Sequence, residues 1–174
     1  PNPFTHAQDE HKDLEIALRR LRPTVSRVLA ETAGAFLAAE AVPGSGWTAM
    51  ARLPDLGVLQ CSQRNVGEKH EMICNLSVEK SEWRRLLGAS GCEAFSQDAF
   101  CEMVNCLCGS LLADAVFLDE FGYLIPCVPY AGHFRLPAET RSLRGAFRIG
   151  GATVHYAIAV LASAAYQPRQ AILA

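Results

Sequence analysis

A carboxylate and an amide stand three residues apart in the otherwise apolar stretch FCEMVNCLCGSLLADA, residues 100–115. Glu102 can form a charge-assisted hydrogen bond to a cationic group. Asn105 can donate and accept hydrogen bonds without bringing negative charge to its partner. If both side chains lie on one face of a helix, this pair could bind or orient a second molecule.

The spacing of apolar residues predicts such a helix. At about 100° per residue, apolar side chains gather on one arc of the helix, which is its core face. This face consists of Phe100, Val104, Leu107 and Leu111, with Met103 at its margin. The opposite side holds a set that we call the helix stripe: Asp98, Glu102, Asn105, Cys106, Gly109 and Ala113. Neighbours three and four residues apart meet on a helix surface, so Glu102 and Asn105 are expected to lie side by side.

Gly109 in the middle of this helix costs about 1 kcal/mol relative to alanine, so something should use the missing side chain. One explanation is a partner molecule that approaches the helix closely. The other is tight packing of another helix or strand of the same chain. The spacing alone also allows a helix face that is merely solvated, with no function.

The seven cysteines do not form a metal-binding or disulfide pattern; they are Cys61, Cys74, Cys92, Cys101, Cys106, Cys108 and Cys127. A zinc site needs two close pairs separated by a loop, and the one close pair here is Cys106-x-Cys108. An odd count with no secretion signal argues against a disulfide framework. No cysteine is followed six positions later by arginine, as a cysteine-phosphatase loop requires. We expect the sulfurs to lie in the core.

Length and composition indicate one ordinary domain. The chain has 174 residues, a net charge of −2 and a pI near 6.2, which gives no electrostatic footprint for nucleic acid or an anionic membrane. No apolar run approaches the roughly 20 residues of a membrane span, and no signal-peptide core is present. We expect a cytoplasmic protein; the first residue, Pro1, indicates a processed chain or a fragment.

The pattern of elements predicts an α+β fold, with two long helices packed on a mixed or antiparallel sheet and a coarse internal duplication. The helices are expected at 23–42, at 81–87, and from a cap at Ser96 to about Phe117. The strands are expected at 47–53, 57–61, 71–78, 123–130, 142–149 and 153–160. Gly150-Gly151 predicts a hairpin between the last two. We divide the chain into an N-terminal arm or short helix (1–22), one domain (23–162) and a tail (163–174).

Two segments carry a resemblance to a known family. The segment EMVNCLCG, residues 102–109, resembles the E-x-x-N-x-x-x-G helix signature of the CheC/CheX class of chemotaxis phosphatases. The segment LIPCVPYAG, residues 124–132, is similar to the I-P-x-V-x-x-G strand that follows this helix in CheX-like members. The resemblance covers roughly residues 23–162.

The resemblance implies hydrolysis of the aspartyl phosphate of a CheY-like receiver domain. It implies that Glu102 docks on the lysine of the receiver's active site and that Asn105 positions a water for in-line attack on phosphorus. The partner-binding surface would include Asp98, Cys106, Gly109 and Ala113. No cofactor of its own is expected, since the receiver would supply Mg²⁺. The alternative is a non-catalytic CheX-like module that docks a receiver or a flagellar or signalling partner.

A second site on the first long helix is not expected. If Gly34 is matched to Gly109, Arg27 stands opposite Glu102 and Ala30 opposite Asn105. This pattern is that of the single-site, CheX-like type. CheX-like relatives pair as homodimers through their sheets, and we expect Thr153–Val160 to provide the edge strand. His133 and His155 are expected to be structural or surface residues.

Overall fold

The computed structural model describes residues 3–44, 57–88, 93–136 and 140–163. These residues form five helices: α1 (Pro3–Arg20), α2 (Arg22–Leu37), α3 (Lys80–Leu86), α4 (Glu93–Ala113) and α5 (Ala115–Phe121). They also form seven strands: β1 (Ala41–Pro43), β2 (Val58–Val66), β3 (His70–Glu79), β4 (Ile125–Pro126), β5 (Tyr130–Ala131), β6 (Leu143–Ile149) and β7 (Ala152–Ala162).

All strand pairs are antiparallel, and the order across the sheet is β1-β6-β7-β3-β2-β4, with β5 also paired to β2. The predicted α+β class is confirmed. The expected hairpin is present as β6 and β7, joined at Gly150 and Gly151, both of which have positive φ. The strand expected at 47–53 lies outside the described residues.

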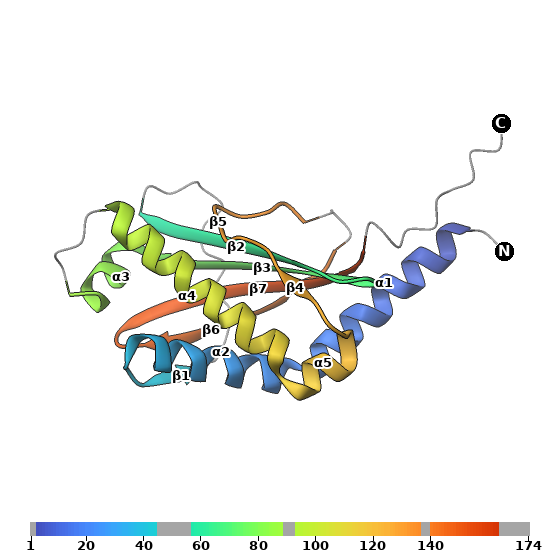
Figure 1. Ribbon diagram of the computed structural model, residues 1–174, viewed down its shortest axis with the longest axis horizontal. Coiled ribbons are helices and arrows are strands. Elements are labelled where there is room, and N and C mark those ends of the chain that lie inside the picture. Colours follow the sequence, from blue (N-terminus) through green and yellow to red (C-terminus); the bar gives the residue numbers. More distant parts are fainter. Residues whose placement is uncertain (1–2, 45–56, 89–92, 137–139, 164–174) are drawn as a thin grey trace.

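The longer helices cover one face of this sheet (Figure 1). The long strand β3 directs alternate residues toward them, namely Met72, Cys74, Leu76 and Val78, and all four belong to the hydrophobic core. From the helices, α1 contributes Leu14 and Leu18, which are both buried. The core therefore includes residues that precede Pro23.

One expected strand is divided. Residues 123–130 form only the two-residue strands β4 and β5, both paired to β2. Pro126 and Pro129 have no backbone N–H, so a continuous ladder over this stretch would lack two of its hydrogen bonds. Between the two strands, the N–H of Cys127 donates to the carbonyl of Arg64, which keeps the segment against β2.

The strand expected to provide a dimer edge is not at an edge. β7 lies between β6 and β3, and both of its backbone sides are hydrogen-bonded, so the prediction for Thr153–Val160 is wrong. The sheet ends instead at β1 and at the β4–β5 side, where Val42, Ile125 and Tyr130 are exposed.

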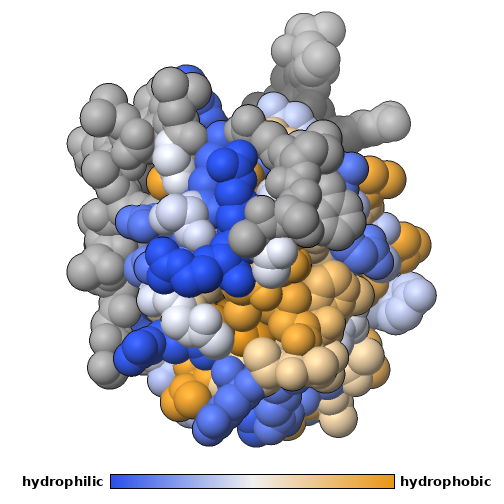
Figure 2. Space-filling view, turned by 90° about the vertical axis from the view of Figure 1, so that its left-hand side faces the viewer, coloured by the Kyte–Doolittle hydropathy of each residue, from blue (hydrophilic) through white to orange (hydrophobic). Residues whose placement is uncertain are grey.

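Figure 2 views the end of the molecule at which α3 and β1 lie, and it shows apolar side chains gathered there.

The central helix begins and ends earlier than expected. It starts at Glu93, so Ser96 is not its cap; Ser96 is buried within the helix, and its carbonyl accepts a hydrogen bond from Trp83 Nε1 at 2.8 Å. It ends at Ala113, where the chain turns by 74° into α5 instead of continuing to Phe117.

Among the described residues, no single helix is long and apolar enough to cross a membrane. The bent pair of α4 and α5 meets the requirements for a membrane span only in length and composition.

Asp114 causes this break. Its backbone is extended (φ −66°, ψ 130°), and its carboxylate accepts from the backbone N–H groups of Val116 at 3.0 Å and Phe117 at 3.3 Å. The carboxylate also pairs with Arg27 of α2 at 3.1 Å. Burial opposes ionisation, but the two N–H groups and Arg27 outweigh it and hold the pKa of Asp114 below its usual value.

Asp114→Ala is therefore expected to lower the free energy of unfolding by about 1 kcal/mol at neutral pH, the usual cost of a lost N-cap. Because the pKa is lower in the folded state, the contribution of the carboxylate is complete above about pH 4, its unfolded pKa, and is lost as the pH falls through the folded pKa. Urea unfolding at pH 7 and pH 3 measures this. Asp114→Asn keeps an acceptor and serves as the control. An equal difference between wild type and Asp114→Ala at both pH values would contradict the assignment.

Candidate functional site

The two predicted faces of α4 are both present. The core face is buried, with Phe100, Met103, Val104, Leu107 and Leu111 all at 0% exposure. Of the helix stripe, Asp98, Glu102, Gly109 and Ala113 are exposed, whereas Asn105 and Cys106 are half-buried. The structure thus brings all six stripe residues to one accessible side of α4.

Glu102 and Asn105 have no hydrogen-bond or ion-pair partner among the residues that the structure describes. Neither side chain is therefore used to hold α4 in place. Polar groups with no internal role are available to a second molecule at little cost to folding. The neighbouring thiol of Cys106 is a different case: burial, followed by the charge of Glu102, raises its pKa, so it is not an activated nucleophile.

Gly109 lies over open space. Apart from its own helix, no described atom lies within 4 Å of the position that a Cβ would occupy. At Gly34 of α2, by contrast, a Cβ would lie 2.9 Å from the carbonyl oxygen of Ala39 and 3.5 Å from Cβ of Ala41. Gly34 is needed for close packing where α2 ends. Within the described part of the chain, tight packing does not explain Gly109.

Gly109→Ala is expected to raise the free energy of unfolding by about 1 kcal/mol, the difference in helix propensity, since the new methyl group meets nothing. Gly34→Ala should lower it, because the methyl group would collide with backbone. Urea denaturation of the two variants beside the wild type measures both effects. A Gly109→Ala variant that is less stable than the wild type would show that the glycine serves the fold.

The neighbouring helix α2 does not repeat the carboxylate–amide pair. Arg27, matched to Glu102, is engaged with Glu31 at 3.1 Å and with Asp114 at 3.1 Å. Ala30, matched to Asn105, is 2% exposed. The matched positions on α2 therefore offer a cation and a buried methyl group. Arg27 thus contacts Asp114, the residue that follows the last stripe residue of α4. The sequence did not predict this contact, because nothing local in it links residues 87 positions apart.

The other candidates have structural surroundings. Within the described ranges, no group of three or more His, Cys, Asp or Glu is placed to hold a metal ion. His133 Nε2 contacts the carbonyl of Leu76 at 2.9 Å, and burial lowers the pKa of His133. Burial likewise lowers the pKa of His155. The hydrogen-bond contact of His133 with the backbone agrees with a structural histidine.

The cysteines follow the prediction only in part. Cys61, Cys74 and Cys108 are buried in the core as expected. Cys101 and Cys106 are half-buried and Cys127 is exposed, so the expectation that the sulfurs lie in the core is wrong for these three. Cys127 follows Pro126 in the segment between β4 and β5, the two short strands that pair with β2.

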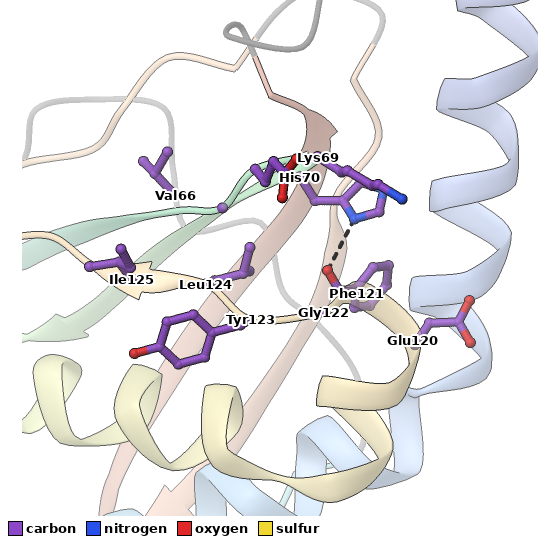
Figure 3. A pocket seen from close by; sticks show the side chains of 11 residues that line it. Val66, Lys69, His70, Glu120, Phe121, Gly122, Tyr123, Leu124 and Ile125 are labelled. Carbon is purple, nitrogen blue, oxygen red and sulfur yellow. Dashed lines mark hydrogen bonds between the residues drawn. The ribbon is translucent and has the colours of Figure 1, made fainter.

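A pocket of about 730 Å³ is lined by residues other than those of the helix stripe (Figure 3). It is formed by the turn between β2 and β3, residues 66–70, and by residues 120–125, which lead from α5 to β4. His70 Nδ1 meets the carbonyl of Phe121 at 3.1 Å and ties the two walls together. No stripe residue lines the pocket, so it is not part of the candidate site.

The comparisons with known proteins identify the fold. No family model and no curated protein matches the sequence. Among solved structures, chemotaxis protein CheX of Vibrio vulnificus superposes with a TM-score of 0.62 at 12% identity, over 81% of this chain and 99% of the other.

Two further structures agree with this match. A putative chemotaxis protein of Desulfovibrio vulgaris Hildenborough gives a TM-score of 0.60 at 11% identity, over 81% of this chain and 96% of that one. The CheX of a CheX–CheY–BeF3–Mg²⁺ complex from Borrelia burgdorferi gives 0.50 at 13% identity, over 78% and 96%. The sheet, the covering helices and these superpositions together establish that this chain has the fold of the CheX and CheC-like chemotaxis proteins.

Proposed function

We propose that this protein hydrolyses the aspartyl phosphate of a phosphorylated receiver domain. The observation that carries the proposal is the pair Glu102 and Asn105 on an accessible face of α4, without internal partners and one turn from an unobstructed Gly109. The fold supports it, since a structure of the same fold is a CheX bound to CheY, BeF3 and Mg²⁺.

The reaction asks little covalent chemistry of the protein. An acyl phosphate is already activated, so acceleration requires mainly a water held in line with phosphorus. The amide of Asn105 can accept a hydrogen bond from that water and donate one to a phosphoryl oxygen. A carboxylate at this position would repel the phosphoryl group, which is why an amide suits the role.

Glu102 holds the receiver in place. It lies one helical turn from Asn105, and its carboxylate can pair with the lysine of the receiver's active site. The open space over Gly109 lets the receiver approach the helix backbone, and Ala113 continues the low surface. Asp98 and Cys106 flank the contact. Mg²⁺ belongs to the receiver in this scheme and is needed there to neutralise phosphoryl charge.

Glu102→Gln is expected to weaken the docking of a receiver about tenfold or more, because a hydrogen bond between two charged groups becomes one with a neutral partner. In steady-state phosphate release, KM should rise while kcat changes little, the signature of lost binding. Asp98→Asn, one turn earlier on the same face, is the matched control and should change KM far less. Equal effects of the two substitutions would show that general negative charge, and not Glu102, guides docking.

The homodimer stays a prediction. Since β7 is internal, pairing through the sheet requires β1 or the β4–β5 side. Light scattering at micromolar concentration tests it, and a clean monomer would remove it.

A further inference from the structure

Four cysteines line the contact between α4 and the sheet. Cys101 and Cys108 come from α4, Cys61 from β2 and Cys74 from β3. The side chains of Cys61 and Cys101 lie close enough to interact, and so do those of Cys74 and Cys108. All four are free thiols. The proposed function uses none of them.

A side chain on α4 holds the first pair together. Gln97, one turn before Cys101, donates from Nε2 to the carbonyl of Gln60 at 3.2 Å, and the same Nε2 lies 3.3 Å from Sγ of Cys101. Gln60 immediately precedes Cys61 on β2. Gln97 therefore spans from the strand to the helix and places Cys101 over the part of β2 that carries Cys61.

The two pairs differ in access to solvent. Cys74 is 2% exposed and Cys108 is 1% exposed, so a solute cannot reach the second pair in the folded protein. Cys61 is 0% exposed. Cys101 is only half-buried and is the single member of the four that a small oxidant can reach.

We propose that Cys61 and Cys101 form a peroxide-reactive dithiol, which oxidises to a disulfide that joins β2 to α4. Hydrogen peroxide reacts first with the accessible sulfur of Cys101. The O–O bond breaks, an S–O bond forms, and the products are Cys101 sulfenic acid and one water.

Cys61 then resolves the sulfenic acid. Its sulfur attacks Cys101 Sγ, the S–O bond breaks as the S–S bond forms, and the thiol proton leaves with the hydroxide as a second water. In total, two thiols and one peroxide give one disulfide and two waters. Cys61 is fully buried, so peroxide in solution does not reach it, whereas it can reach Cys101. This difference in access gives Cys101 the peroxidatic role and Cys61 the resolving role.

The disulfide would anchor α4 to the sheet at the residue directly before Glu102. It closes a loop between residues 61 and 101, so the oxidised protein should unfold at a higher temperature than the reduced protein. A thiol reductant should reverse the shift.

The experiment treats the reduced full chain with stoichiometric hydrogen peroxide, blocks remaining thiols by alkylation, and maps disulfide-linked peptides by mass spectrometry without reduction. The expected result is a linkage between Cys61 and Cys101, formed within one chain. Cys101→Ser and Cys61→Ala should each abolish it. Cys106→Ser, on the same helix and also half-buried, is the matched control and should retain it. The Cys127→Ser background removes the exposed thiol that could link two chains.

Several outcomes would overturn the proposal. They are a sulfinic or sulfonic acid at Cys101 with no linkage, a Cys74–Cys108 linkage that forms first, or a Cys101 that stays a thiol while Cys106 is oxidised. The linkage map is read on a chain that keeps both Cys61 and Cys101, so the proposal remains decidable even if Cys61→Ala fails to fold.

Discussion

Asn105→Ala is expected to lower the rate of phosphate release from a phosphorylated receiver about 100-fold or more, with little change in receiver affinity. Removal of one preorganised hydrogen-bonding group at a reacting centre costs about 3 kcal/mol of transition-state stabilisation. The side chain of Asn105 has no hydrogen bond to the rest of the described chain, so its loss should leave stability nearly unchanged. Single-turnover dephosphorylation, with affinity measured separately on a BeF3-activated receiver, separates the two effects.

Two variants sharpen this test. Asn105→Asp keeps the size of the side chain but brings negative charge toward the phosphoryl group, so it should be as slow as the alanine variant. Ser110→Ala, on α4 but outside the helix stripe, should behave like the wild type. If Asn105→Ala lost affinity in proportion to its rate, Asn105 would be a docking contact and not the group that orients the water.

Trp83→Ala is expected to lower the free energy of unfolding by about 3–5 kcal/mol, the range for removal of a large aromatic side chain from a core. Trp83 is 0% exposed, and its ring meets that of Phe100 edge-on, with centroids 5.3 Å apart. Its Nε1 also donates to the carbonyl of Ser96. The residue thereby fastens α3 to the first half of α4, the helix that carries the stripe.

Trp83→Phe is the matched control for this prediction. It retains an aromatic ring but not the indole N–H, so it should lose roughly 1–3 kcal/mol, the cost of leaving one buried carbonyl unsatisfied. Urea denaturation followed by circular dichroism gives both values. A loss below about 1 kcal/mol for Trp83→Ala would mean that α4 is held on the sheet without α3.

The faces of α4 could be predicted from the sequence because they depend only on helical periodicity. Residues 100–111 alternate between buried and accessible positions with the period of a helix, and the structure keeps that division. The bounds of α4 depended on tertiary contacts. Ser96 has the chemistry of a cap, but the sequence does not show that Trp83 binds its carbonyl inside the helix.

The sequence at Asp114 contains a local signal for the start of a new helix, but the apolar periodicity across Asp114 favoured one continuous helix. Aspartate followed by an apolar run is a typical N-cap pattern, and here the carboxylate caps Val116 and Phe117. The apolar residues Val116 and Phe117 nevertheless continued the helical pattern of α4. An extended ψ at a single residue was enough to start a new helix.

The position of β7 could not be predicted because it depends on a non-local pairing. Gly150-Gly151 fixes β6 as one neighbour through a tight turn. The other neighbour, β3, is distant in sequence, with Met72 paired to Val160, and hairpin chemistry carries no information about it. The same limit applies to Gly109: its cost to the helix was evident in the sequence, but its open surroundings depend on how the other elements pack around α4.

The most direct test of the central claim is the rate of phosphate release from a panel of phosphorylated receivers of the source organism, with and without this protein. We predict that catalytic amounts of the wild type accelerate dephosphorylation of at least one receiver well above its own rate of hydrolysis, in the presence of Mg²⁺. Unchanged rates for every receiver, together with binding of an activated receiver, would contradict the proposed phosphatase.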